Sequence, residues 1–147
     1  VRLSKSEESM KKFSFKFKSI ETVRRTREEE ALRHLGNSQR ALQTAKERKN
    51  QLLSDIEQAL LRREKLSDVP ASPTDYQLEN DFISGTKQRV IQADQAISRA
   101  SRQLEKSMRA YLLARQQTRM IEVLREKEQE NFRKQRNKFE AKVLEDS

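Results

Sequence analysis

The chain has 147 residues, of which 33% are hydrophobic and 37% are charged, and it carries a formal net charge of +9. Two Gly, two Pro and few apolar residues exclude a globular core of ordinary size. No Cys occurs, which excludes disulfides and thiolate chemistry and fits a reducing compartment. The positive charge favours an acidic partner, which is nucleic acid, anionic lipid or an acidic protein surface.

Residues 1–18 are expected to form a lead-in to the first helix. Met10 has the character of a natural start, so we expect residues 1–9 to be a leader or a tag. Within residues 10–18, Phe13, Phe15 and Phe17 stand at alternate positions among Lys and Ser, a period typical of a strand. Because this fragment is too short and isolated to form a sheet, we expect an irregular lead-in whose Phe side chains pack on the neighbouring helix. A docking motif of aromatics among lysines is the alternative.

Residues 19–67 are predicted to form a first long helix. Its mostly apolar positions recur three and four residues apart, a spacing typical of a coiled-coil seam. Between Ile20 and Leu35 the spacing drifts to successive fours, which indicates a stutter. Gly36 lies inside this helix, where it either allows close approach of a partner helix or only lowers the local stability of the helix. The regular series is Leu35, Ser38, Leu42, Ala45, Lys49, Leu52, Ile56, Ala59, Arg63 and Leu66.

Residues 68–74 are the single predicted loop, because they contain both prolines among Ser, Thr and Asp. Thr74 or Asp75 is expected to cap the helix that follows. Residues 75–145 are predicted to form that second helix. Its seam is Ile83, Thr86, Val90, Ala93, Ile97, Ala100, Leu104, Ser107, Tyr111, Ala114, Thr118, Ile121, Arg125, Glu128, Phe132, Gln135, Phe139 and Lys142.

This sustained periodicity decides between a coiled coil and disorder, since a disordered chain has no reason to keep it. A seam helix of this length spans roughly 90 Å and requires an equally long partner. One short loop between two seam helices supplies that partner within the chain. The predicted fold is therefore all-α, with two long helices forming an antiparallel coiled-coil hairpin and one elongated domain over residues 10–147. The expected register places Leu35 near Ser107, Leu52 near Val90 and Met10 near Phe132.

Basic residues gather near both ends of the chain, which the hairpin would bring together at its open end. Their concentration predicts a binding surface, and an ordinary solvated surface is the alternative. The candidate residues are Lys16, Lys18, Arg24, Arg25, Arg27, Arg133, Lys134, Arg136 and Lys138.

The sequence lacks the motifs that are typical of catalytic sites and of His/Cys metal sites. His34 is the only histidine and no Cys accompanies it, so no His/Cys metal cluster can form. No Gly-rich phosphate loop, nucleophile elbow or HExxH spacing occurs. We therefore predict a protein that is not an enzyme and uses no cofactor. No apolar stretch has the length of a membrane span.

Several short motifs occur along the chain in a particular order and spacing. They are Met10 to Phe13 with Phe15 and Phe17, the stretch 24–35, Asp75 to Gln77 with Phe82 and Ile83, and Phe132 to Gln135. Together they resemble the FliJ family, the coiled-coil component of the bacterial flagellar type III export apparatus, and the resemblance covers nearly the whole chain from Met10.

The resemblance implies a hairpin similar to the central stalk of rotary ATPases. Its basic open end would insert into the hexameric export ATPase and promote assembly of that ring. Residues nearer the loop would contact the export-gate membrane protein and export chaperones, which places the protein in the cytoplasm, peripherally at the inner membrane. The positions carried over for gate contact are Leu52, Phe82, Thr86, Arg89 and Ala93, of which Thr86 and Arg89 depart from the family's apolar types.

Two alternatives remain at this point. The first is the equivalent stalk of a virulence type III secretion system, which the sequence does not separate from a flagellar one. The second is a basic coiled coil that binds nucleic acid through its phosphates, with affinity that falls steeply with salt. We do not expect nucleic acid, because Phe132 and Phe139 lie in the predicted seam and leave little surface for base stacking.

Overall fold

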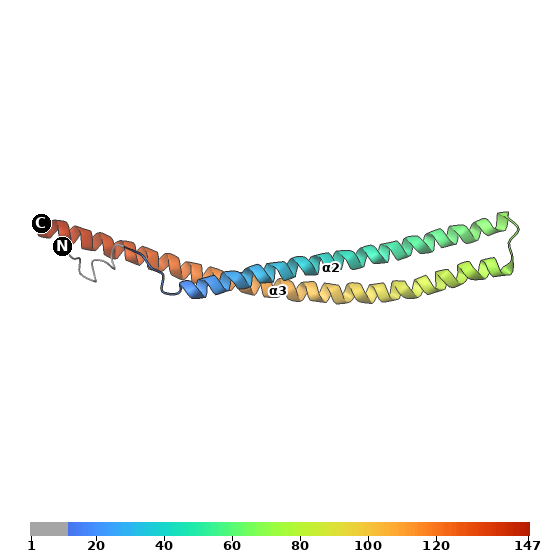
Figure 1. Cartoon of the computed structure of the whole chain (residues 1–147), viewed down its shortest axis with the longest axis horizontal. Helices are drawn as coiled ribbons and strands as arrows, with labels where there is room; N and C mark the ends of the chain where they lie inside the picture. The colour runs from blue at the N-terminus through green and yellow to red at the C-terminus, as the bar shows by residue number, and fades with distance from the viewer. Residues whose placement is uncertain (1–11) are drawn as a thin grey trace. The chain divides into compact units, whose positions relative to one another are not determined.

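A computed structural model describes residues 12–147, so the predictions for residues 1–9 and for the contact of Met10 lie outside the described part. Helix α2 spans Lys18–Lys65, a short 3-10 helix η1 spans Leu66–Asp68, and helix α3 spans Pro73–Asp146. The two long helices are joined by one short connection (Figure 1). The predicted all-α hairpin of two packed helices is confirmed.

The helices pack in two compact units. The first unit comprises residues 1–32 and 110–147, described from residue 12, and contains both ends of the chain. The second unit comprises residues 33–109 and contains the connection between the helices. The basic candidate residues all belong to the first unit, and the gate candidates all belong to the second.

In the second unit, the predicted seam of α2 forms the interface with α3. Every position of the predicted series from Leu35 to Leu66 is buried or partly buried, and so is every position of the α3 series from Ile83 to Ser107. The buried apolar residues of this unit are Leu35, Leu52, Ala59, Ile83 and Ala93. The narrow apolar stripe and the charged residues around it therefore favour pairing of two helices over packing into a wider core.

Two polar contacts define the register of the second unit. The hydroxyls of Ser38 and Ser107 lie 2.7 Å apart in the buried interface, and Lys49 Nζ lies 2.7 Å from Asp94 Oδ1. Ser107 was expected near Leu35, and it bonds to Ser38, one turn further along α2. Because both serines are buried, this bond satisfies two polar groups of the seam.

The start of α3 is capped by Ser72. The Ser72 backbone N–H donates to Asp75 Oδ2 at 2.9 Å, and the Asp75 N–H reaches back to Ser72 Oγ at 3.4 Å. This reciprocal pair is a capping box, with Pro73 at the first helical position where its missing N–H costs nothing. Asp75, one of the two predicted residues, thus supplies a side-chain oxygen to the cap from inside the first turn, whereas the cap position itself is Ser72.

In the first unit, the three-four spacing of α2 continues without the predicted stutter. The partly or fully buried positions before Leu35 are Glu21, Arg24, Glu28 and Ala31. Ile20 and Val23, which suggested the stutter, are exposed. The seam keeps its period because charged residues of α2 meet polar partners on α3, so the apolar pattern alone was misleading here.

The lead-in packs through its aromatic side chains, as expected. The rings of Phe13 and Phe132 lie 5.7 Å apart, and those of Phe15 and Phe17 lie 5.9 Å apart. Phe15 is buried. Backbone bonds from the amides of Lys18 and Glu21 to the carbonyls of Phe15 and Phe17 then start α2.

Candidate functional site

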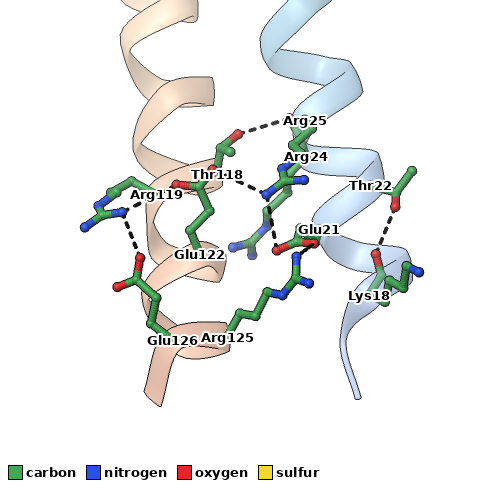
Figure 2. A network of polar contacts seen from close by, with 10 residues as sticks. All are labelled: Lys18, Glu21, Thr22, Arg24, Arg25, Thr118, Arg119, Glu122, Arg125 and Glu126. Carbon is green, nitrogen blue, oxygen red and sulfur yellow. Dashed lines mark hydrogen bonds and ion pairs between the residues drawn. The ribbon is translucent and has the colours of Figure 1, made fainter. Parts of the chain in front are cut away.

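A buried carboxylate, Glu21, is the centre of a charged network between α2 and α3 in the first unit (Figure 2). Only 3% of Glu21 is exposed. Arg125 Nη1 donates to its Oε1 at 3.0 Å, and Arg25 Nη2 lies 3.6 Å from its Oε2. Because a buried carboxylate is costly without a partner, these two guanidinium groups make its burial tolerable.

The network leaves two buried polar atoms without a hydrogen bond, Glu21 Oε2 and Arg125 Nε. Oε2 has only the longer ion-pair contact to Arg25. The pair is therefore well placed to hold one relative position of the helices, but it is not fully satisfied. Such pairs define register more than they add stability.

A second set of bonds joins the same helices one turn further along. Arg24 Nη1 donates to the backbone carbonyl of Gln117 at 3.1 Å. The Thr118 hydroxyl lies 3.2 Å from the carbonyl of Arg24, so it donates back across the interface (Figure 2). It also lies 3.1 Å from the carbonyl of Ala114 in its own helix. Arg24 is thus a structural residue of the interface as well as a positive charge.

The outer side of the network is a chain of exposed ion pairs. Glu122 lies 3.7 Å from Arg25 and 3.5 Å from Arg119, and Arg119 also lies 3.4 Å from Glu126 (Figure 2). Exposed pairs of this kind contribute little to stability, about 0–1 kcal/mol each. Their main effect is to neutralise part of the positive charge on this side.

The structure divides the nine basic candidates into two groups. Arg24 and Arg25 belong to the interface network, Arg133 pairs with Glu130 at 2.7 Å, and Arg136 lies 4.0 Å from Glu140. Lys16 lies over the ring of Phe17, 5.4 Å from its centroid. Within residues 12–147, no ion pair is found for the exposed side chains of Lys18, Arg27, Lys134 and Lys138.

The gate candidates in the second unit also divide by burial. Leu52, Thr86 and Ala93 are buried in the helix interface, and Thr86 is fully so. The Thr86 hydroxyl donates to the carbonyl of Phe82 at 2.7 Å and accepts from Arg89 Nη1 at 3.1 Å. Only Phe82 and Arg89 are exposed enough to meet another molecule.

Phe82 is held by a guanidinium group of α2. The centre of the Arg62 guanidinium lies 5.5 Å from the Phe82 ring centroid. Arg62 also donates two parallel hydrogen bonds to Glu79, at 3.0 and 3.2 Å. The hydrogen bond to Glu79 raises the pKa of Arg62, and the fork geometry orients the cation over the ring.

The Glu21–Arg125 pair is a feature of this site that the sequence analysis did not predict. Arg125 was predicted only as a position of the α3 seam, and Glu21 was not singled out. The available signal was the heptad itself: extended back from Leu35 in steps of four and three, it reaches Glu21. A charged residue at such a position calls for an opposite charge on the facing helix.

Among the described residues, no group of three or more His, Cys, Asp or Glu side chains is arranged to hold a metal ion. In the same part of the chain, no helix is long and apolar enough to cross a membrane. Fold and sites together define a helical hairpin whose distinctive features are charged and aromatic surfaces suited to contacts with other proteins.

The chain belongs to the FliJ family: the family model described as Flagellar FliJ protein matches residues 13–146. Members of this family are non-enzymatic components of flagellar protein export. Comparison with curated proteins found no significant match, and comparison with solved structures found none either.

Proposed function

We propose that this protein is the stalk of the flagellar export ATPase, inserting the charged end of the hairpin into the hexameric ring. Membership of the FliJ family over residues 13–146 carries this proposal. The protein would act in the cytoplasm, peripherally at the inner membrane, and link the ATPase to the export gate and to export chaperones.

The first unit has the properties that such a stalk needs. A stalk must keep its two helices in one register while its surface is pushed by a surrounding ring. Glu21, Arg125 and the bonds of Arg24 and Thr118 hold that register across the interface. Lys18, Arg27, Lys134 and Lys138 are exposed and offer charge to an acidic ring surface.

The proposed gate contact uses the second unit in two ways. Phe82 and Arg89 would touch the export-gate protein directly, because they are exposed. The buried residues Leu52, Thr86 and Ala93 would not touch the partner. They would act indirectly, by packing in the interface that supports α3, the helix that carries Phe82 and Arg89. The hydrogen bonds of Thr86 to Phe82 and Arg89 connect the two groups.

Mixing the protein with the export ATPase tests the stalk proposal. We expect increased hexamer formation and faster ATP hydrolysis, measured by light scattering and phosphate release. The triple variant Arg27→Glu, Lys134→Glu, Lys138→Glu should lose most of this effect and keep its helicity. The matched control, Lys46→Glu, Lys87→Glu, Lys106→Glu, makes the same charge change in the second unit and should stimulate normally. An ATPase that does not respond to the unmodified protein would contradict the proposal.

The gate contact is tested with Phe82→Ala and the control Leu78→Ala, which removes another exposed apolar side chain of α3. Binding to the cytosolic part of the export-gate protein and flagellar export in cells are the measurements. We expect both to fall for Phe82→Ala only. Normal export by that variant would remove Phe82 from the contact.

A further inference from the structure

Three positions of the seam between α2 and α3 carry long cationic side chains, Lys49, Arg63 and Arg125. Each is partly buried. Lys49 stands three residues before Leu52, and Arg63 stands four residues after Ala59, and both of these apolar neighbours are buried. The cations therefore occupy places in the seam where an apolar side chain would continue the repeat.

The two cations of α2 each have a polar partner on α3 within the second unit. Lys49 Nζ lies 2.7 Å from Asp94 Oδ1. Arg63 Nη1 donates to Asn80 Oδ1 at 2.9 Å. In the first unit, Arg125 of α3 has its partner on α2, as described above. Each cation is thus paired across the seam of the hairpin.

The cations also keep part of their contact with water. The side chains of Lys49 and Arg125 are 33% and 38% exposed. In a seam of only two helices, one edge of each side chain stays open to solvent. Complete burial would remove this hydration, which is strongly unfavourable for a charged group.

The pair of Arg125 with Glu21 is a poor choice for stability alone. Glu21 Oε2 and Arg125 Nε are buried without a hydrogen bond. An apolar pair of similar volume would leave no such atoms and would pack at least as well. Polar residues at seam positions, Lys among them, are known instead to specify how many helices join a coiled coil, at a cost in stability.

We propose that Lys49, Arg63 and Arg125 restrict this seam to two helices, so that two copies of the chain do not combine through their seams into a four-helix bundle. Seam positions face the centre of such a bundle, where the three cations would lose their water. Pairing of like seams in parallel would instead place each cation beside the same cation of the other copy, and juxtaposed like charges disfavour that arrangement. This role does not depend on an ATPase ring, so it can fail separately from the proposed function.

An apolar seam tests the proposal in the full chain. The variant Glu21→Leu, Lys49→Leu, Arg63→Leu, Arg125→Leu removes the cations together with the buried carboxylate. Sedimentation equilibrium of the unmodified chain should show a monomer. The variant should form dimers at concentrations at least about a hundredfold lower than any association of the unmodified chain. A variant that stays monomeric, or an unmodified chain that already dimerises equally well, would overturn the proposal.

A surface variant controls for added hydrophobicity. Arg40→Leu, Glu57→Leu, Lys65→Leu, Arg102→Leu changes the same residue types, three on α2 and one on α3, at exposed positions outside the seam. It should remain monomeric. Association as strong as that of the seam variant would show that the seam is not responsible, and would overturn the proposal.

A charge exchange separates pairing from mere polarity. Glu21→Arg with Arg125→Glu keeps one cation and one anion in the seam, and it should remain a helical monomer by sedimentation and circular dichroism. The four-Leu variant should unfold in urea at a midpoint that rises with protein concentration, because its folded state is a dimer. Dimers of the exchanged variant, or a midpoint of the four-Leu variant that is independent of concentration, would contradict the assignment.

Discussion

Arg125 Nη1 donates a hydrogen bond to Oε1 of Glu21 at 3.0 Å, joining two residues that lie 104 positions apart in the sequence. The carboxylate is buried and the guanidinium is only partly so. The bond therefore fixes the two helices of the first unit against one another at the end that carries the basic residues.

Removing Arg125 should destabilise the protein. Arg125→Met leaves the Glu21 carboxylate buried with only the longer contact to Arg25, and we expect a loss of about 2 kcal/mol, below the 3–5 kcal/mol of fully buried pairs. Urea unfolding followed by circular dichroism measures it. The double variant Glu21→Leu, Arg125→Met should recover most of the loss, because no unpaired charge remains. A double variant as unstable as the single one would contradict the pair's role.

The Ser38–Ser107 pair should behave in the same asymmetric way. Ser107→Val leaves the Ser38 hydroxyl buried without its partner, which costs about 1–3 kcal/mol. Replacing both serines by Ala should cost less than the single change. Ser101→Ala, on the exposed face of the same helix, serves as the control for helix propensity. The measurement is thermal unfolding of the unmodified protein and the three variants. A double variant that is less stable than Ser107→Val would contradict the asymmetry.

Loss of the Ser72 cap should weaken the start of α3. Ser72→Ala removes the side-chain partner of the Asp75 amide, with an expected cost of about 1 kcal/mol. Thr74→Ala alters the residue that the sequence suggested as a cap and should be close to neutral. Chemical denaturation compares the two, and equal costs would argue against the capping box.

Leu52 and Leu53 form a matched pair for the interface. Leu52 is 3% exposed and Leu53 is 45% exposed. Leu52→Ala should cost about 2–5 kcal/mol through lost burial and an unfilled space. Leu53→Ala should stay within about 0.5 kcal/mol, as is usual for surface positions. Guanidinium unfolding midpoints of both variants test the assignment of the seam.

Gly36 should tolerate a side chain. A Cβ there would meet only the Arg40 guanidinium of the same helix, at 3.7 Å, so close approach of the partner helix does not require glycine. Gly36→Ala should stabilise the protein by up to about 1 kcal/mol through helix propensity. Gly85→Ala has a similar environment and should behave alike. A lower melting temperature for Gly36→Ala would show a hidden contact.

The sequence alone predicted the two helices, their connection and most of their buried positions. These follow from local periodicity and from two prolines, which are readable without knowing the partner of any residue. The seam from Leu35 to Leu66 needed no correction for this reason. The stutter before Leu35 was a mistake because exposed Ile20 and Val23 appeared to be part of the seam.

What only the tertiary structure decided was which polar groups meet. Three contacts depend on the register between segments far apart in the sequence: the pairing of Glu21 with Arg125, the bond of Ser107 to Ser38, and the hydrogen bond that Arg24 donates to a backbone carbonyl. Apolar side chains in a repeating seam fit several registers almost equally well, whereas hydrogen bonds and ion pairs require particular atoms within about 3 Å. The same contacts decided which basic residues are left exposed to meet a partner.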